Sequence, residues 1–209
     1  MQILLLSLEW FRCIMTPMTM QLQQRLFTIQ DMEQMIANGI LGEDERIELI
    51  EGHLITMSPP GAPHAACVTR LNKAFSRQVD DDMLVRIQDP MQTHERTQPE
   101  PDIAILTPRQ DFYTSGRPTA NDVLLLIEVL DSSLKYDEET KLPLYAAAGV
   151  REVWIVNLQD HWIDCYSDPA PRTYRLRERF FAGDTIHPDA LPKVSIDVSY
   201  VLNPLAFVD

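Results

Sequence analysis

The chain has 209 residues, enough for one well-buried domain with helices and strands and short for two. Hydrophobic residues make up 45% and charged residues 23%, which excludes a collagenous, low-complexity or broadly disordered chain. The net charge of −13 argues against a general nucleic-acid-binding surface, because lysine and arginine supply most of the affinity for phosphates. An acidic protein can still bind nucleic acid if its basic residues line one cleft.

The cysteines and the N-terminal segment carry no sign of secretion or of a membrane protein. The apolar run Ile3–Leu8 is too short to span a bilayer, and no positive charge precedes it, as a signal peptide would require. The cysteines are odd in number and far apart, without a CxxC pair, so we expect no disulfide framework, no zinc site and a cytoplasmic location. They are Cys13, Cys67 and Cys165.

We expect residues 1–20 to be a disordered arm or an artefact of start-codon choice, and residues 21–209 to form a single domain, because no linker or repeat interrupts them. The first predicted helix is Thr28–Asn38. Thr28 is suited to the N-cap with Asp31 three residues later, and Gly39 can end the helix.

A β-hairpin is predicted next, over Arg46–Met57. Apolar and charged residues alternate there, and Gly52 provides the turn. The proline-rich segment Ser58–Pro63 reads as a rigid loop, and His64–Val79 has the apolar spacing of a second helix.

The second half of the chain predicts a mixed sheet. Val123–Leu130 is continuously apolar except for Glu128, which is typical of a central strand buried on both faces. A helix over Lys141–Gly149 and a buried strand over Arg151–Leu158 follow. Further strands are predicted at Leu84–Ile87, Asp102–Leu106, Trp162–Tyr166 and Thr173–Arg177, before a closing helix or turn. The fold class is therefore α/β, with a central mixed sheet flanked by helices and preceded by a helix and a hairpin.

Two carboxylates occupy strand positions where apolar residues are expected. Asp102 begins one strand and Glu128 lies near the end of the most hydrophobic one, and a buried carboxylate needs a cation partner. Adjacent strand ends with one carboxylate each, together with the backbone carbonyl of Val129, would suit Mg²⁺ or Mn²⁺. Lys141 can reach the same place from the following helix. Such a set suits phosphodiester hydrolysis, in which the metal acidifies a water and the ammonium stabilises the transition state.

Each of these residues also has a simpler interpretation. Asp102, which follows a proline, could cap a turn, and Glu128 could pair with an arginine or lysine in the core. Lys141 taken alone would be a solvated helix residue. Residue types and spacing leave these alternatives open.

The stretch from Arg46 to Leu158 resembles the Uma-two-type restriction endonuclease family, a branch of the PD-(D/E)XK nuclease superfamily. The order and spacing of six segments carry the resemblance. They are Ile47–Gly52, Ser58–Pro60 with the following His64, Pro101–Ala104, Ile127–Ser133, Lys141–Val150 and Glu152–Val156.

This resemblance implies a restriction-endonuclease-like core with Asp102 and Glu128 as metal ligands. The superfamily lysine usually lies two residues after the second acid, where this chain has Leu130, and Lys141 matches a lysine moved to the next helix. Glu48 matches an acidic residue of the hairpin and is a candidate accessory ligand. His64 is a candidate contact to a phosphate or to water at the metal.

The expected function is metal-dependent hydrolysis of nucleic acid, with DNA as the first candidate substrate. The alternative is an inactive nuclease fold that serves as a dimerising or protein-binding scaffold, which the net charge of −13 favours. A homodimer is expected for the active form, because cutting two strands calls for two sites related by symmetry.

Overall fold

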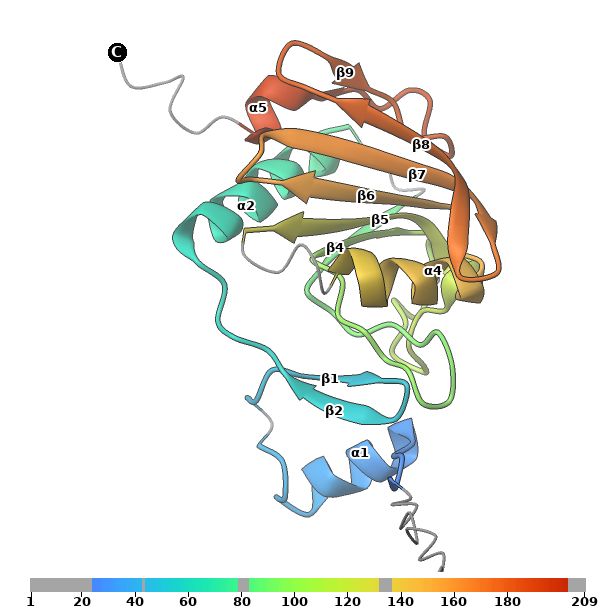
Figure 1. The fold of residues 1–209 in the computed structure, drawn as a ribbon. Helices are drawn as coiled ribbons and strands as arrows, with labels where there is room; N and C mark the ends of the chain where they lie inside the picture. Colours follow the sequence, from blue (N-terminus) through green and yellow to red (C-terminus); the bar gives the residue numbers. More distant parts are fainter. Residues whose placement is uncertain (1–23, 43, 79–82, 132–136, 203–209) are drawn as a thin grey trace, which may run out of the picture.

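A six-stranded mixed sheet forms the centre of the computed structural model, which describes residues 24–42, 44–78, 83–131 and 137–202 (Figure 1). The strand order is β3-β4-β5-β6-β7-β8, and only the β5–β6 pair is parallel. The expected arm, residues 1–20, lies outside the described residues. The strands are β3 (Leu84–Ile87), β4 (Ile103–Leu106), β5 (Val123–Leu130), β6 (Glu152–Asn157), β7 (Trp162–Ala170) and β8 (Thr173–Phe180). The predicted mixed α/β sheet is confirmed.

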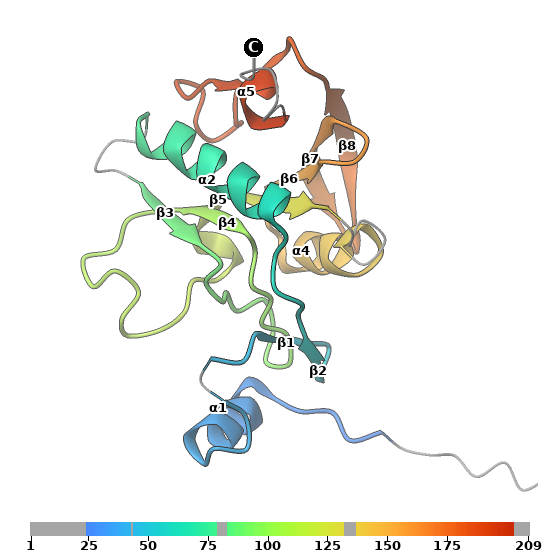
Figure 2. The same ribbon diagram turned by 90° about the vertical axis from the view of Figure 1, so that its left-hand side faces the viewer.

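Helices cover both faces of this sheet (Figure 2). Helix α2 (Ala62–Ser76) packs on one face and α4 (Leu142–Ala148) on the other. Successive side chains of β4 alternate between the two cores: Ile103 belongs to the α2 side and Ala104 to the α4 side. Strand β5 is buried on both faces, as its apolar run predicts.

The parallel strands β5 and β6 need a crossover connection, and α4 lies in it. One turn of π-helix, η2 (Asp137–Lys141), precedes α4. The α-helix itself starts one residue before Pro143, whose ring and missing N–H prevent a regular bond to the carbonyl four residues earlier. Gly149, in a left-handed conformation at φ +85°, ends α4 as predicted.

The N-terminal unit has a small hydrophobic core of its own beside the main sheet (Figure 1). It contains α1 (Ile29–Ala37) and the antiparallel pair β1 (Ile47–Ile50) and β2 (His53–Thr56). The predicted capping box of Thr28 and Asp31 is present at the start of α1. Only glycine fits at position 52, because a Cβ there would stand 2.6 Å from the Cβ of Leu26.

Some boundaries differ from the sequence prediction. Helix α2 begins at Ala62, before the predicted His64, because Gly61 serves as N-cap and Pro63 suits the first turn. Its predicted end, Val79, lies outside the described residues. The last two strands of the sheet are longer than predicted, and the C-terminal part adds a small strand pair before the expected closing helix. These are β9 (Thr185–Ile186), β10 (Ile196–Asp197) and α5 (Val198–Leu202).

No helix in the described part of the chain is long and apolar enough to cross a membrane. Cys67 and Cys165 are free thiols, and Cys13 lies outside the described residues.

Glu152 is a buried carboxylate at the start of β6, remote from the pocket described below. Its oxygens accept hydrogen bonds from the Trp154 indole at 2.6 Å and from the Asp189 backbone N–H at 2.7 Å. Burial outweighs these bonds and raises the pKa of Glu152 from 4.5 to about 7. A carboxyl with a raised folded-state pKa stabilises the fold fully below pH 4.5, and this contribution is lost as the pH rises through 7.

We predict that Glu152→Gln flattens the decline in unfolding free energy between pH 4.5 and 8. Wild type should lose on the order of 3 kcal/mol more than the variant over this range. In the variant, the NH₂ group of the new glutamine must face one of the two N–H donors that bind Glu152. This mismatch lowers the unfolding free energy by a similar amount at every pH. Urea unfolding at several pH values measures both effects, with the exposed Glu178→Gln on β8 as control. Parallel curves for wild type and Glu152→Gln would contradict the prediction.

Candidate active site

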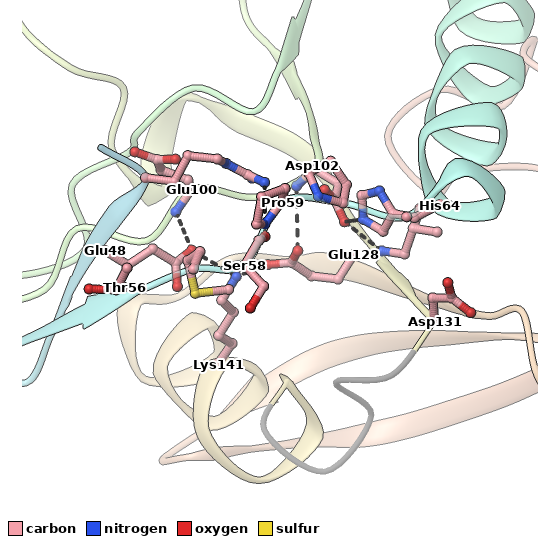
Figure 3. Close-up of a pocket in the computed structure, with 15 residues that line it drawn as sticks. Glu48, Thr56, Ser58, Pro59, His64, Glu100, Asp102, Glu128, Asp131 and Lys141 are labelled. Atoms are coloured by element: carbon pink, nitrogen blue, oxygen red, sulfur yellow. Dashed lines mark hydrogen bonds and ion pairs between the residues drawn. The ribbon is translucent and has the colours of Figure 1, made fainter. Parts of the chain in front are cut away.

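Asp102 and Glu128 meet at one end of two neighbouring interior strands, where β4 begins and β5 ends (Figure 3). Because Ile103 pairs with Ile127 in this antiparallel register, the residue before Ile103 lies opposite the residue after Ile127. The Asp102 backbone N–H points to Oε2 of Glu128 at 3.4 Å. Both residues are buried, with 7% and 3% of their surface exposed.

Three donors hold the Asp102 carboxylate. Its Oδ2 lies 2.9 Å from His64 Nε2 and 2.9 Å from the Val129 backbone N–H, and its Oδ1 accepts from Gln88 Nε2 at 3.2 Å. Burial raises the pKa of this carboxyl, but the bond and charge of His64, with the bonds from Val129 and Gln88, leave the pKa below its usual value. Asp102 is therefore ionised at neutral pH and oriented before any ligand arrives.

Lys141 reaches the two strands from the last position of the π-turn η2, where 3% of its surface is exposed. Its Nζ lies 2.8 Å from Oε1 of Glu48 and 3.3 Å from Oε1 of Glu128. The same Glu128 oxygen accepts a hydrogen bond from the Tyr145 hydroxyl at 2.6 Å. Lys141 thus lies between two carboxylates that come from different parts of the fold.

Glu48 projects from β1, in the N-terminal unit, and only 1% of its surface is exposed. Its Oε1 accepts the Glu100 backbone N–H at 2.8 Å in addition to Lys141. Its Oε2 is buried and has no hydrogen-bond partner among the described residues. A buried carboxylate oxygen without a donor is costly and marks a place for a cation or a bound water.

These residues line a cavity of about 290 Å³ between the hairpin, the Ser58–Gly61 linker and the strand ends that carry Asp102 and Glu128. Burial, and then the neighbouring Glu48 carboxylate, raise the pKa of Glu100 at its wall. The lining carries five carboxylates against one arginine and one lysine, so the cavity attracts cations. They are Glu48, Glu100, Asp102, Glu128 and Asp131, with Arg46 and Lys141.

All six residues singled out in the sequence lie at this cavity: Glu48, His64, Asp102, Glu128, Val129 and Lys141. The sequence reasoning missed two of their partners. Tyr145 could have been found, because it is four residues after Lys141 and the helical repeat places such a pair on one face. Gln88 could not, because its side chain reaches Asp102 from a left-handed backbone at φ +50° directly after β3.

The donor set fits a hard divalent cation. In the described part of the chain no three His, Cys, Asp or Glu side chains form a ready-made metal cage. Mg²⁺ does not need one, since it is usually held by one or two carboxylates and completes its shell with water and substrate phosphates. The carboxylates of Asp102 and Glu128 supply oxygen ligands of this kind, and nearby lies Oε2 of Glu48, for which the described part of the chain offers no hydrogen-bond partner.

The likeness to a solved structure establishes the fold class. A protein from Anabaena variabilis, described as "a putative nuclease belonging to DUF820", superposes with a TM-score of 0.61 at 18% identity, over 84% of this chain and 97% of that one. The fold is restriction-endonuclease-like. The model of the Uma2 family, described as "Putative restriction endonuclease", matches residues 29–199, so the chain belongs to the Uma2 family. No curated protein matches the chain.

We predict strong energetic coupling between Glu48 and Lys141. Lys141→Met leaves two carboxylates buried without their ammonium, and breaking such a pair costs about 3–5 kcal/mol of unfolding free energy. In a double-mutant cycle with Glu48→Gln, the coupling energy should exceed about 1.5 kcal/mol.

The matched control is the exposed ion pair of Glu51 and Arg172, which joins the same hairpin to the β7–β8 turn at 3.1 Å. Its coupling should stay below about 1 kcal/mol. Urea unfolding of all variants in the two cycles gives both coupling energies. Equal coupling energies would show that burial does not strengthen the contact between Lys141 and Glu48.

Proposed function

We propose that the cavity is the active site of a metal-dependent nuclease that hydrolyses phosphodiester bonds. The observation that carries the proposal is the convergence of three buried carboxylates at one cavity. Two of them contact Lys141, and one oxygen of Glu48 has no hydrogen-bond partner among the described residues. Burying this set costs hydration free energy that well-packed apolar residues would not lose, which favours a functional reason for keeping it. Membership of a family described as "Putative restriction endonuclease" supports the same reaction.

Asp102, Glu128 and the backbone carbonyl of Val129 would hold Mg²⁺ or Mn²⁺, with Glu48 as an accessory ligand. When bound, such an ion supplies positive charge to the phosphate and lowers the pKa of a water. The protein prepares this site in advance, because Asp102 is ionised and held by His64, Val129 and Gln88.

Lys141 is proposed to orient the attacking water and to stabilise the negative charge that develops on the phosphorane-like transition state. Its ammonium is held by Glu48 and Glu128 at the cavity wall. His64 is proposed to contact the scissile phosphate or a water beside Asp102, since its Nε2 lies next to the Asp102 carboxylate.

DNA is the proposed substrate, and a cytoplasmic homodimer is the proposed working form. Two copies related by a two-fold axis would present one active site to each strand of a duplex. With a net charge of −13, affinity for the backbone must come from the cavity and its metal more than from the general surface.

The direct test is cleavage of supercoiled plasmid, single-stranded DNA and RNA with Mg²⁺ or Mn²⁺. We predict that wild type nicks or linearises plasmid only with a divalent ion. Asp102→Asn and Lys141→Met should each lower the rate at least about 100-fold, as expected when a group that stabilises developing charge is lost.

The control is Asp160→Asn, which changes an exposed aspartate on the β6–β7 turn and should cut like wild type. Thermal melting shows which variants are folded. Wild type, Asp102→Asn and Lys141→Met behaving alike on all three substrates would reject the nuclease proposal in favour of an inactive scaffold with the same fold.

A further inference from the structure

We infer that Tyr145 is a positioning residue for this metal centre: its hydroxyl fixes the Glu128 carboxylate by making the shorter of the two contacts to Oε1, beside the Lys141 ammonium. The inference rests on the proposed function, because it concerns the same centre. It adds a residue from α4 that touches neither the proposed substrate nor the cation.

The contacts of one carboxylate oxygen carry the argument. Oε1 of Glu128 receives the Tyr145 hydroxyl at 2.6 Å and the Lys141 ammonium at 3.3 Å. The ammonium stands closer to Glu48, at 2.8 Å. The tyrosine therefore makes the short bond to Glu128, and the lysine makes its short contact to Glu48.

Packing holds the tyrosine in this place. Tyr145 is fully buried in the core cluster between α4 and the sheet, and it stands one turn after Lys141 on the same face of the helical segment. Its ring cannot leave without opening that core. Lys141, by contrast, has a flexible stem of four methylenes and can move toward either carboxylate.

The two donors differ in what they do to the carboxylate. A hydroxyl is neutral, so it orients Glu128 without adding positive charge beside the carboxylate. If the Lys141 ammonium moved from 3.3 Å into the place of the hydroxyl, it would offset more of the Glu128 charge and compete more strongly with a divalent ion. The last torsion of a glutamate is broad, so the carboxylate would turn toward Lys141 once the hydroxyl is gone. Tyr145 thus preserves the cation affinity of Glu128 and the closer contact of Lys141 with Glu48.

The test is direct Mn²⁺ binding by calorimetry, on the intact protein without nucleic acid. Tyr145→Phe removes only the hydroxyl and should weaken Mn²⁺ binding about 10-fold, the usual effect of losing a group that orients a metal ligand. In cleavage assays the Mn²⁺ concentration for half-maximal rate should rise by the same factor, while the rate at saturating Mn²⁺ changes much less. Asp102→Asn provides the baseline for binding outside the centre.

Tyr174→Phe is the matched control. Tyr174 is buried in the same core cluster, and its hydroxyl donates to the Val150 carbonyl at 2.8 Å, away from the cavity. It should lower the melting temperature by an amount comparable to Tyr145→Phe and leave Mn²⁺ affinity unchanged.

The outcomes separate this inference from the nuclease proposal. Equal Mn²⁺ affinity in wild type and Tyr145→Phe overturns the role of Tyr145, as does an equal loss of affinity in the two tyrosine variants. If wild type binds Mn²⁺ but cuts no nucleic acid, the nuclease proposal fails. The ratio of the Mn²⁺ affinities of wild type and Tyr145→Phe then still decides the role of Tyr145. No Mn²⁺ binding by wild type above the Asp102→Asn baseline overturns both.

Discussion

A lysine ammonium buried between two carboxylates is the constraint on which this structure depends. Burying Lys141 requires that Glu48 and Glu128 both reach it, since an unpaired buried charge is far too costly. Glu48 comes from the hairpin and Glu128 from the central sheet, so the ion cluster joins the N-terminal unit to the main domain. The backbone pairing of Leu49 with Gln98 and the bond from Glu100 to Glu48 support the same junction. The cavity exists because these two parts are held at this separation.

Much of the fold could be predicted because it follows from local patterns. The apolar run of β5, the capping box of α1 and the glycine that ends α4 each need only neighbouring residues to specify them. The proximity of Asp102 and Glu128 was also predictable, since both lie at strand ends that an antiparallel pairing brings together. Their metal-binding role is a proposal that the geometry supports.

The rest of the site depends on tertiary geometry, which a linear pattern does not contain. The sequence predicts an ordinary helix around Lys141, whereas the chain forms a π-turn before Pro143 that sets where the ammonium emerges. The contact of His64 with Asp102 depends on how α2 lies on the sheet, and that of Gln88 on a left-handed residue at the end of a strand. Tertiary packing sets these contacts, and the residue types alone do not predict them.

The buried cluster also sets an order of events during synthesis. Glu48 is made early, Asp102 and Glu128 follow, and Lys141 comes last of the four. A chain still being translated therefore holds unmatched carboxylates and no complete centre until the crossover helix after β5 has emerged from the ribosome. Assembly of the centre therefore waits for the last of these four residues to be made.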